Sequence, residues 1–116
     1  MLMESKSSIT AMKEKYPEIA KAFEAIMKEE YELFAKKMLD YGKANIAVGT
    51  ALESEEEVKL ALTGLFFRMN DKVQRIKNIV VMGNKPNVQD ETILDTFRDL
   101  SIYGVIAQIV ATNKWK

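Results

Sequence analysis

The stretch that decides the fold is "ESEEEVKLALTGLFFRMNDKVQRIKNIVVMG", residues 53–83. Ser54 followed three residues later by Glu57 matches a helix capping box, and the neighbouring glutamates suit the positive end of a helix. The spacing of the apolar residues that follow alternates between four and three, which is typical of a coiled-coil seam. We therefore predict one long helix that Gly83 and Pro86 end. Its apolar seam comprises Leu62, Phe66, Met69, Val73, Ile76 and Val80.

Two further long helices are expected on either side of this one. The first begins near Pro17, a residue favoured at the first helical position, and runs to Tyr41, just before Gly42. The other begins near Asp90, with acidic residues in its first turn, and continues to about Thr112. Before the proline, "SSITAMKEKY" predicts a short helix. The predicted class is therefore all-α, with three long helices and a short N-terminal helix in a bundle.

Length and charge limit the possible functions. A chain of 116 residues is one ordinary domain, so a single helical domain over residues 1–116 is expected. Seventeen basic and seventeen acidic side chains cancel, which argues against general nucleic-acid binding. The composition, 47% hydrophobic and 29% charged, fits a soluble cytosolic protein without a membrane span. "MLMESKSSIT" lacks an apolar run and a cleavage signature, so no signal peptide is expected.

The chain contains neither Cys nor His. The missing cysteine excludes disulfides, thiolate metal sites and Cys nucleophiles. The missing histidine removes the commonest general base and the commonest transition-metal ligand. No cofactor is required on this basis, and any metal would be a hard cation such as Mg²⁺ held by carboxylates.

A second apolar feature predicts self-association. The segment "IYGVIAQIVA", residues 102–111, is apolar nearly all round. A helix that is apolar on every side is buried on every side, which a three-helix domain of this size cannot achieve alone. We therefore expect a homo-oligomer.

Arg68, Lys72 and Arg75 form a basic stripe on the central helix, within about 60° of one another. Exposed ion pairs are common and contribute little, so the stripe fits a solvated edge that pairs with nearby acids. Alternatively, two guanidinium forks and an ammonium converge on a phosphate, for which arginine has a suitable bidentate geometry. The sequence leaves both interpretations open.

Glu91, Asp95 and Asp99 form an acidic stripe, because they advance only about 40° per step on the last helix. Acids at this spacing can coordinate Mg²⁺ when a second helix bearing carboxylates faces them. Acids four residues apart are also frequent on solvated helix surfaces. The metal site is therefore a candidate that spacing alone does not decide.

Aromatic and amide side chains sharpen the ligand hypothesis. Phe67 and Asp71 occupy a face turned away from the seam, where a nucleobase can stack on the ring and hydrogen-bond to its neighbours. An aromatic residue in such a place is also found as a packing contact beneath a loop. Tyr41 and Asn45 belong to the turn "YGKANI", which can close over a site. Tyr103 is a second candidate for stacking.

Three segments together resemble a phage and prophage family, the nucleotide modification associated domain, type one. They are "YGKANI" at 41–46, "TGLFFRMNDKVQRIKN" at 63–78 and "QDETILDTFRDLSIYGVIA" at 89–107, and the likeness runs from Tyr41 to Trp115. The resemblance implies a helical, phage-encoded protein with a nucleotide-related role. The polar residues that it would carry over are Tyr41, Asn45, Arg68, Asp71, Lys72, Arg75, Asp90, Glu91, Asp95, Asp99 and Tyr103.

A more distant likeness is to the all-α nucleoside triphosphate pyrophosphatases of the MazG type. These enzymes place carboxylates from two neighbouring helices around Mg²⁺, and Glu91 and Asp95 match one side of such a site. The other side needs a Glu-x-x-Glu pair, where this chain has Arg68 to Arg75 instead. The acidic cluster at 53–57 lies about 22 Å further along the helix axis. This departure from the pattern puts catalysis in doubt.

The function expected from the sequence is to bind and sequester a nucleotide or a nucleotide-derived signalling molecule, in a counter-defence or nucleotide-modification context. The small oligomeric proteins with which phages sequester nucleotide immune signals are similar to this chain in size. Two alternatives remain. One is an Mg²⁺-dependent nucleotide pyrophosphatase, and the other is a non-catalytic subunit of a nucleotide-modifying complex.

Overall fold

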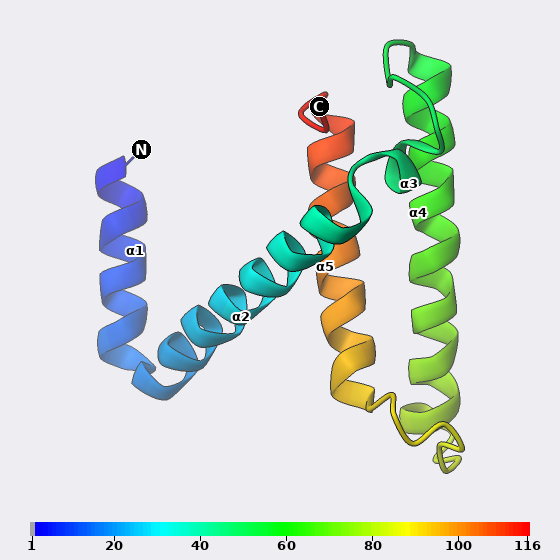
Figure 1. Cartoon of the computed structure of the whole chain (residues 1–116). Helices are drawn as coiled ribbons and strands as arrows, with labels where there is room; N and C mark the ends of the chain where they lie inside the picture. The colour runs from blue at the N-terminus through cyan, green and yellow to red at the C-terminus, as the bar shows by residue number, and fades with distance from the viewer. Residues whose placement is uncertain (1) are drawn as a thin grey trace. The chain divides into compact units, whose positions relative to one another are not determined.

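The computed structural model describes residues 2–116, and for residues 2–7 it describes the backbone alone. Met1, which opens the stretch in which no signal peptide is expected, lies outside the described residues. The described part is all-helical and contains no strand, so the predicted class is confirmed (Figure 1). Its elements are α1 (Leu2–Lys15), α2 (Pro17–Tyr41), α3 (Ala44–Ala47), α4 (Glu55–Ile76), a π-helical turn η1 (Lys77–Val81) and α5 (Ile93–Ala111).

The chain divides into two compact units, one up to Lys36 and the other Lys37–Lys116. In the first unit, α1 ends just before Pro17 opens α2, as predicted. An ion pair between Lys13 and Glu24, 3.0 Å long, joins the two helices. Helix α2 ends at Tyr41 in the second unit, so the predicted bounds of this helix are confirmed at both ends. The single domain over residues 1–116 stays a prediction.

The start of α4 follows the capping signal in the sequence. The Ser54 hydroxyl accepts a hydrogen bond from the Glu57 backbone N–H at 3.1 Å, and the Glu57 carboxylate accepts one from the Glu53 N–H at 2.8 Å. The far end differs from the prediction, because α4 stops at Ile76 and η1 continues to Val81. A π-helical turn changes the rotation per residue, so the four-three spacing of the seam holds only as far as Ile76.

Helix α5 begins later than predicted. Thr92 is its N-cap and forms a reciprocal capping box with Asp95, in which each side chain accepts from the other's backbone N–H at 3.1 Å. Asp90 and Glu91 therefore precede the helix instead of opening it. Because this cap satisfies two of the free N–H groups at the helix start, the boundary is fixed at Ile93.

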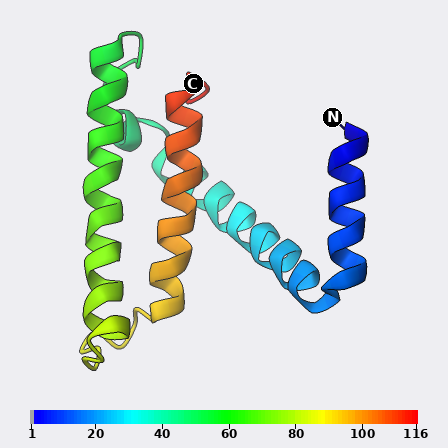
Figure 2. The ribbon, with the colours of Figure 1, turned by 180° about the vertical axis from the view of Figure 1, so that it is seen from behind.

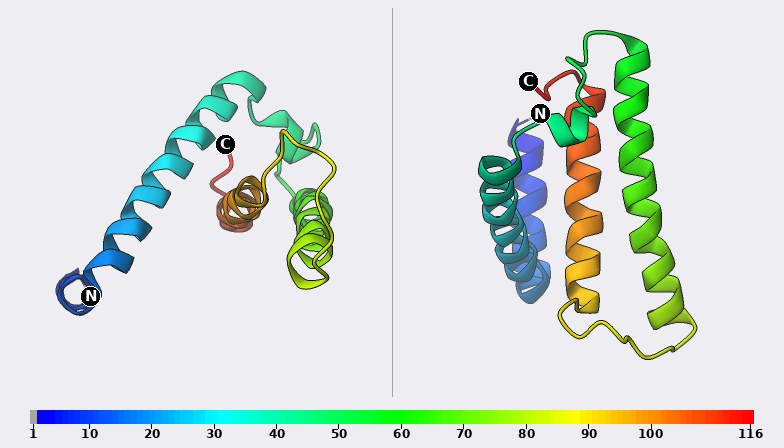
Figure 3. Two further views of the ribbon diagram at one scale, coloured as in Figure 1. Left: turned by 90° about the horizontal axis from the view of Figure 1, so that it is seen from below. Right: turned by 45° about the vertical axis from the view of Figure 1, so that its right-hand side comes forward.

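The core of the second unit lies between α4 and α5, which run antiparallel and side by side in every view (Figures 1, 2 and 3). Helix α3, in a segment that the sequence predicted only as a turn, packs against α4. The C-terminal segment returns to this region, where the Trp115 indole N–H donates to the Lys43 carbonyl at 3.1 Å. The buried apolar residues of this unit are Ile46, Ala47, Ala61, Leu65, Ile102, Ile106, Val110 and Trp115.

The buried face of α4 is not the predicted seam. Ala61 and Leu65 are 0% and 1% exposed, whereas Phe66 and Val73 of the seam are 57% and 45% exposed. The seam is therefore not the face of α4 that forms the core of this unit. Helix α4 turns the neighbouring strip toward α5, and this strip continues from Leu65 into the basic stripe at alternating steps of three and four residues.

Candidate functional site

Lys72 links the two helices of the hairpin. Its ammonium lies 3.2 Å from the Glu91 carboxylate and 3.2 Å from the Asp99 carboxylate, and Lys37 lies 3.8 Å from Asp99. The Lys72 side chain is only 22% exposed. Burial lowers the pKa of Lys72, but hydrogen bonds to Glu91 and Asp99 outweigh this effect and raise the pKa above its usual value. The ammonium thus stays charged and paired.

Arg75 makes a second link, one turn further along α4. Its guanidinium donates to the Thr96 hydroxyl at 3.0 Å and to the Glu91 backbone carbonyl at 2.8 Å, and its Nε lies 4.0 Å from the Glu91 carboxylate. Thr96 is fully buried on α5. Arg75 therefore fixes the segment that leads into α5. The sequence analysis missed Thr96, because a single threonine beside an acidic stripe carries no distinctive signal.

The two charged stripes are therefore largely one network. Lys72 and Arg75 supply two positive charges, Glu91 and Asp99 supply two negative charges, and all four side chains are at most 35% exposed. The sequence left two interpretations of the basic stripe open, and for Lys72 and Arg75 the structure shows pairing with nearby acids. The pairs are partly buried bridges and not the solvated edge that the sequence suggested.

Arg68 differs from the other two members of the basic stripe. Its guanidinium is 3.4 Å from the Asn45 backbone carbonyl, a long hydrogen bond. Among the described side chains of the second unit, no carboxylate lies within ion-pairing distance of this guanidinium. Arg68 is half-buried beside α3, which contains Asn45. Its charge is therefore available to an anion, and its described contact is with the backbone of α3.

Further candidate ligand-binding residues surround Arg68 in the sequence and in the fold. Phe67 is 60% exposed and forms a tilted ring pair with Phe66, with centroids 5.5 Å apart. The Asn45 amide oxygen accepts from the Ile46 N–H at 2.9 Å, and its NH₂ group makes no hydrogen bond among the described residues. Asp71 is exposed one turn after Phe67.

The two tyrosines differ in how they relate to this group. Tyr41, at the end of α2, is 69% exposed. Tyr103 is half-buried on α5, and no hydrogen bond or ring contact joins it to Arg68 or Phe67 in the described chain. The geometry thus brings Asn45 to Arg68, and it does not bring Tyr103 to them.

The three candidate metal ligands are engaged in other contacts. Glu91 and Asp99 pair with Lys72, and Asp95 serves the capping box and lies 3.5 Å from Arg98. Among the residues that the structure describes, no three carboxylates are arranged to hold a metal ion. The Mg²⁺ site stays a prediction.

The cap of α5 makes stability depend on pH. Hydrogen bonds from the Thr92 backbone and side chain lower the pKa of Asp95 below 3.8. A lowered carboxyl pKa in the folded state stabilises the fold above the unfolded value and is lost as pH falls through the folded value. We expect Asp95→Asn to be less stable than the unmodified chain near pH 7, with a difference that closes below about pH 4. Urea unfolding followed by Trp115 fluorescence across this range measures it, and a constant difference would contradict the cap's role.

Comparison with family models, with curated proteins and with solved structures gives no match for this chain. The resemblance to the nucleotide modification associated domain and the likeness to the MazG-type enzymes therefore stay predictions. Over the described helices, none has both the length and the apolar composition required to cross a bilayer.

Proposed function

We propose that this protein binds the phosphate of a nucleotide or nucleotide-derived molecule at Arg68 and sequesters that molecule without converting it. The observation that carries the proposal is the guanidinium of Arg68, which has no carboxylate partner among the described side chains of its unit and lies beside Asn45 of α3. A guanidinium forms two parallel hydrogen bonds with a phosphate and is suited to a partly desolvated site.

The neighbours of Arg68 support a nucleotide over a simple phosphate. The exposed ring of Phe67 offers a face on which a base can stack. Asp71 follows four residues later on nearly the same strip of α4, about 40° away, and its carboxylate can accept hydrogen bonds from the amino groups of a base. The Asn45 amide adds a donor close to the phosphate position. The sequence resemblance of residues 41–115 supports the same ligand class.

Sequestration is favoured over hydrolysis by the residues that are present. The chain has no His or Cys to serve as general base or nucleophile. The carboxylates of Glu91 and Asp99 are already balanced by Lys72, which lowers their ability to neutralise a divalent cation. Binding alone requires only the anion contact, the stacking face and hydrogen-bonding groups.

The decisive experiment is a thermal-shift screen of the purified protein against linear and cyclic nucleotides, followed by mass spectrometry of the ligand released on denaturation. We expect one nucleotide class to raise the melting temperature and to be recovered chemically unchanged. Arg68→Ala should weaken binding by about 10- to 100-fold, the range for losing a charge-assisted hydrogen-bond pair. Arg98→Ala, which removes an arginine from α5, should leave the affinity unchanged.

Three other results would each overturn the proposal. Release of pyrophosphate that depends on Mg²⁺ would establish the pyrophosphatase alternative. Co-purification with an enzyme and no nucleotide binding would establish a non-catalytic subunit. If Arg68→Ala binds the nucleotide with unchanged affinity, Arg68 does not form the anion site, whichever nucleotide binds.

A further inference from the structure

The α4 seam, defined here as Leu62, Phe66, Met69, Val73 and Ile76, is an apolar strip that the second unit leaves uncovered. Phe66 and Val73 are 57% and 45% exposed, and the other three are half-buried. The strip holds its four-three spacing over fifteen residues, which span about 21 Å of helix. Apolar residues that are scattered over a surface show no regular spacing. A strip with a regular four-three spacing is instead typical of a helix that pairs with another helix.

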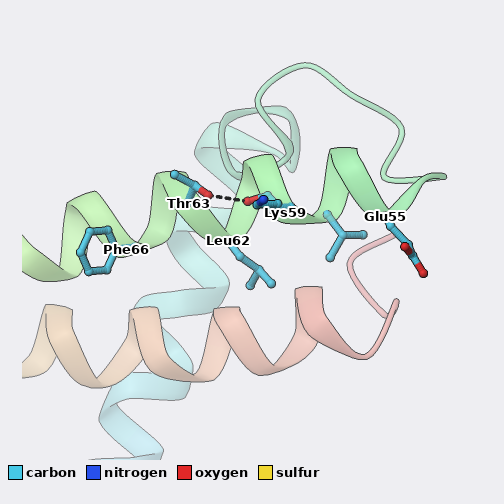
Figure 4. Close-up of a pocket in the computed structure, with 6 residues that line it drawn as sticks. Glu55, Lys59, Leu62, Thr63 and Phe66 are labelled. Carbon is cyan, nitrogen blue, oxygen red and sulfur yellow. Dashed lines mark hydrogen bonds between the residues drawn. The ribbon is translucent and has the colours of Figure 1, made fainter.

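A shallow groove marks one end of the α4 seam. It has a volume of about 360 Å³ and contains Leu62 and Phe66 of the seam (Figure 4). Glu55, Val58, Lys59 and Thr63, from the first half of the same helix, complete its lining. The floor of the groove is apolar, and charged side chains stand at its edge. Such a surface accommodates apolar side chains from a facing helix.

The charges along α4 identify the direction in which a second helix would run. The first turn carries Glu55, Glu56 and Glu57, and Lys77 follows the last residue of the helix. In an antiparallel pair of identical helices, the acidic start of each lies against the basic end of the other, and the helix dipoles also oppose favourably. A parallel pair would place the three glutamates of both copies together. The complementary partner of this strip is therefore a second copy of α4.

We propose that two copies of this chain associate through their α4 seams, antiparallel about a twofold axis that passes between Phe66 and Met69. In this register Phe66 of each copy meets Met69 of the other, and Leu62 meets Val73. The same alignment places Glu56 within two residues, about 3 Å along the axis, of the level of Lys77 of the second copy. The groove beside Leu62 thus receives an apolar side chain of the partner, which is the arrangement expected of an isologous interface.

The oligomeric state tests the proposal with a matched pair of variants. Phe66 and Phe67 are adjacent and about equally exposed, at 57% and 60%, but only Phe66 belongs to the α4 seam. In sedimentation velocity over a range of concentrations, we expect the unmodified chain and Phe67→Glu to be dimeric and Phe66→Glu to be monomeric. If the unmodified chain is monomeric at every concentration, the proposal is wrong, whatever else covers the strip. Equal effects of the two substitutions would overturn it also.

The direction of pairing is tested by cross-linking, which the absence of native cysteine makes specific. Leu62→Cys and Val73→Cys are prepared separately and treated with a thiol cross-linker that spans about 8 Å. We expect neither variant to cross-link with itself, because the two identical positions lie about 16 Å apart along the antiparallel pair. The mixture should give the covalent dimer. Efficient cross-linking of Leu62→Cys with itself would establish a parallel pair and refute the proposed register. Nucleotide binding plays no part in these readouts, so the inference stands or fails separately from the proposed function.

Discussion

Leu65→Ala is expected to lower the free energy of unfolding of the second unit by about 3 kcal/mol. Leu65 is 1% exposed and belongs to the buried face of α4, together with Ala61, which is 0% exposed. Truncation removes apolar surface from the core and leaves a cavity that two straight, antiparallel helices cannot close by a small shift. Because a small domain is stabilised by about 5–15 kcal/mol in total, this is a large fraction of its stability.

Urea unfolding followed by the fluorescence of Trp115 measures this change. Trp115 is the only tryptophan of the chain and is 6% exposed in the second unit, so its emission reports on that unit. Leu60→Ala is the matched control, since Leu60 is on the same helix but 48% exposed, and it should cost less than about 1 kcal/mol. Both variants are compared at one protein concentration, because self-association adds to stability. Similar costs for the two variants would show that α5 packs on another face of α4.

The helices could be predicted from the sequence where a local signal fixes them. Pro17 and Gly42 bound α2, and the Ser54 cap starts α4, because each acts within one turn of the backbone. Local signals did not distinguish between the two possible starts of α5. Acidic residues at 90 and 91 have the charge that suits a first helical turn. The hydrogen bonds between Thr92 and Asp95 nevertheless cap the free backbone N–H groups, so that the helix starts at Ile93 and residues 90 and 91 lie outside it.

The face of α4 that packs on α5 could not be predicted from hydrophobicity. The α4 seam is the more apolar strip, but the strip through Leu65 contains the cations whose partners are on α5 and in the segment before it. Those partners are 16–27 residues away in sequence, so no local pattern reveals them. Pairing between elements, rather than apolar periodicity within one helix, therefore decides the orientation of α4. For the same reason Arg68 could not be distinguished from Lys72 and Arg75 before the fold was known.

Arg75→Gln is expected to lower the free energy of unfolding by about 2 kcal/mol, with little effect on anion binding. The substitution removes the hydrogen bonds to the Thr96 hydroxyl and the Glu91 carbonyl, and hydrogen bonds that involve a charged group contribute about 1.5–3 kcal/mol. It also removes one of the two cations that lie near the Glu91 carboxylate, the other being Lys72. Urea unfolding of Arg75→Gln and of Arg75→Lys measures the loss. Lysine keeps the charge but lacks the fork that reaches both acceptors, so it should recover only part of the stability.

The same measurement on Arg68→Gln separates a bridging arginine from one that is available to a ligand. Arg68 makes one long contact with a backbone carbonyl, so its loss should change the free energy of unfolding by less than about 0.5 kcal/mol. If Arg75 bound a phosphate, its substitution would instead lower the affinity and leave the stability unchanged. In the unliganded protein such a guanidinium is repelled by the neighbouring cations and adds nothing to stability. The two arginines, seven residues apart on one face of α4, should thus give opposite results in the two assays. Their roles differ because carboxylate and carbonyl oxygens lie within reach of Arg75, while among the described residues of the unit Arg68 reaches the Asn45 carbonyl and no carboxylate.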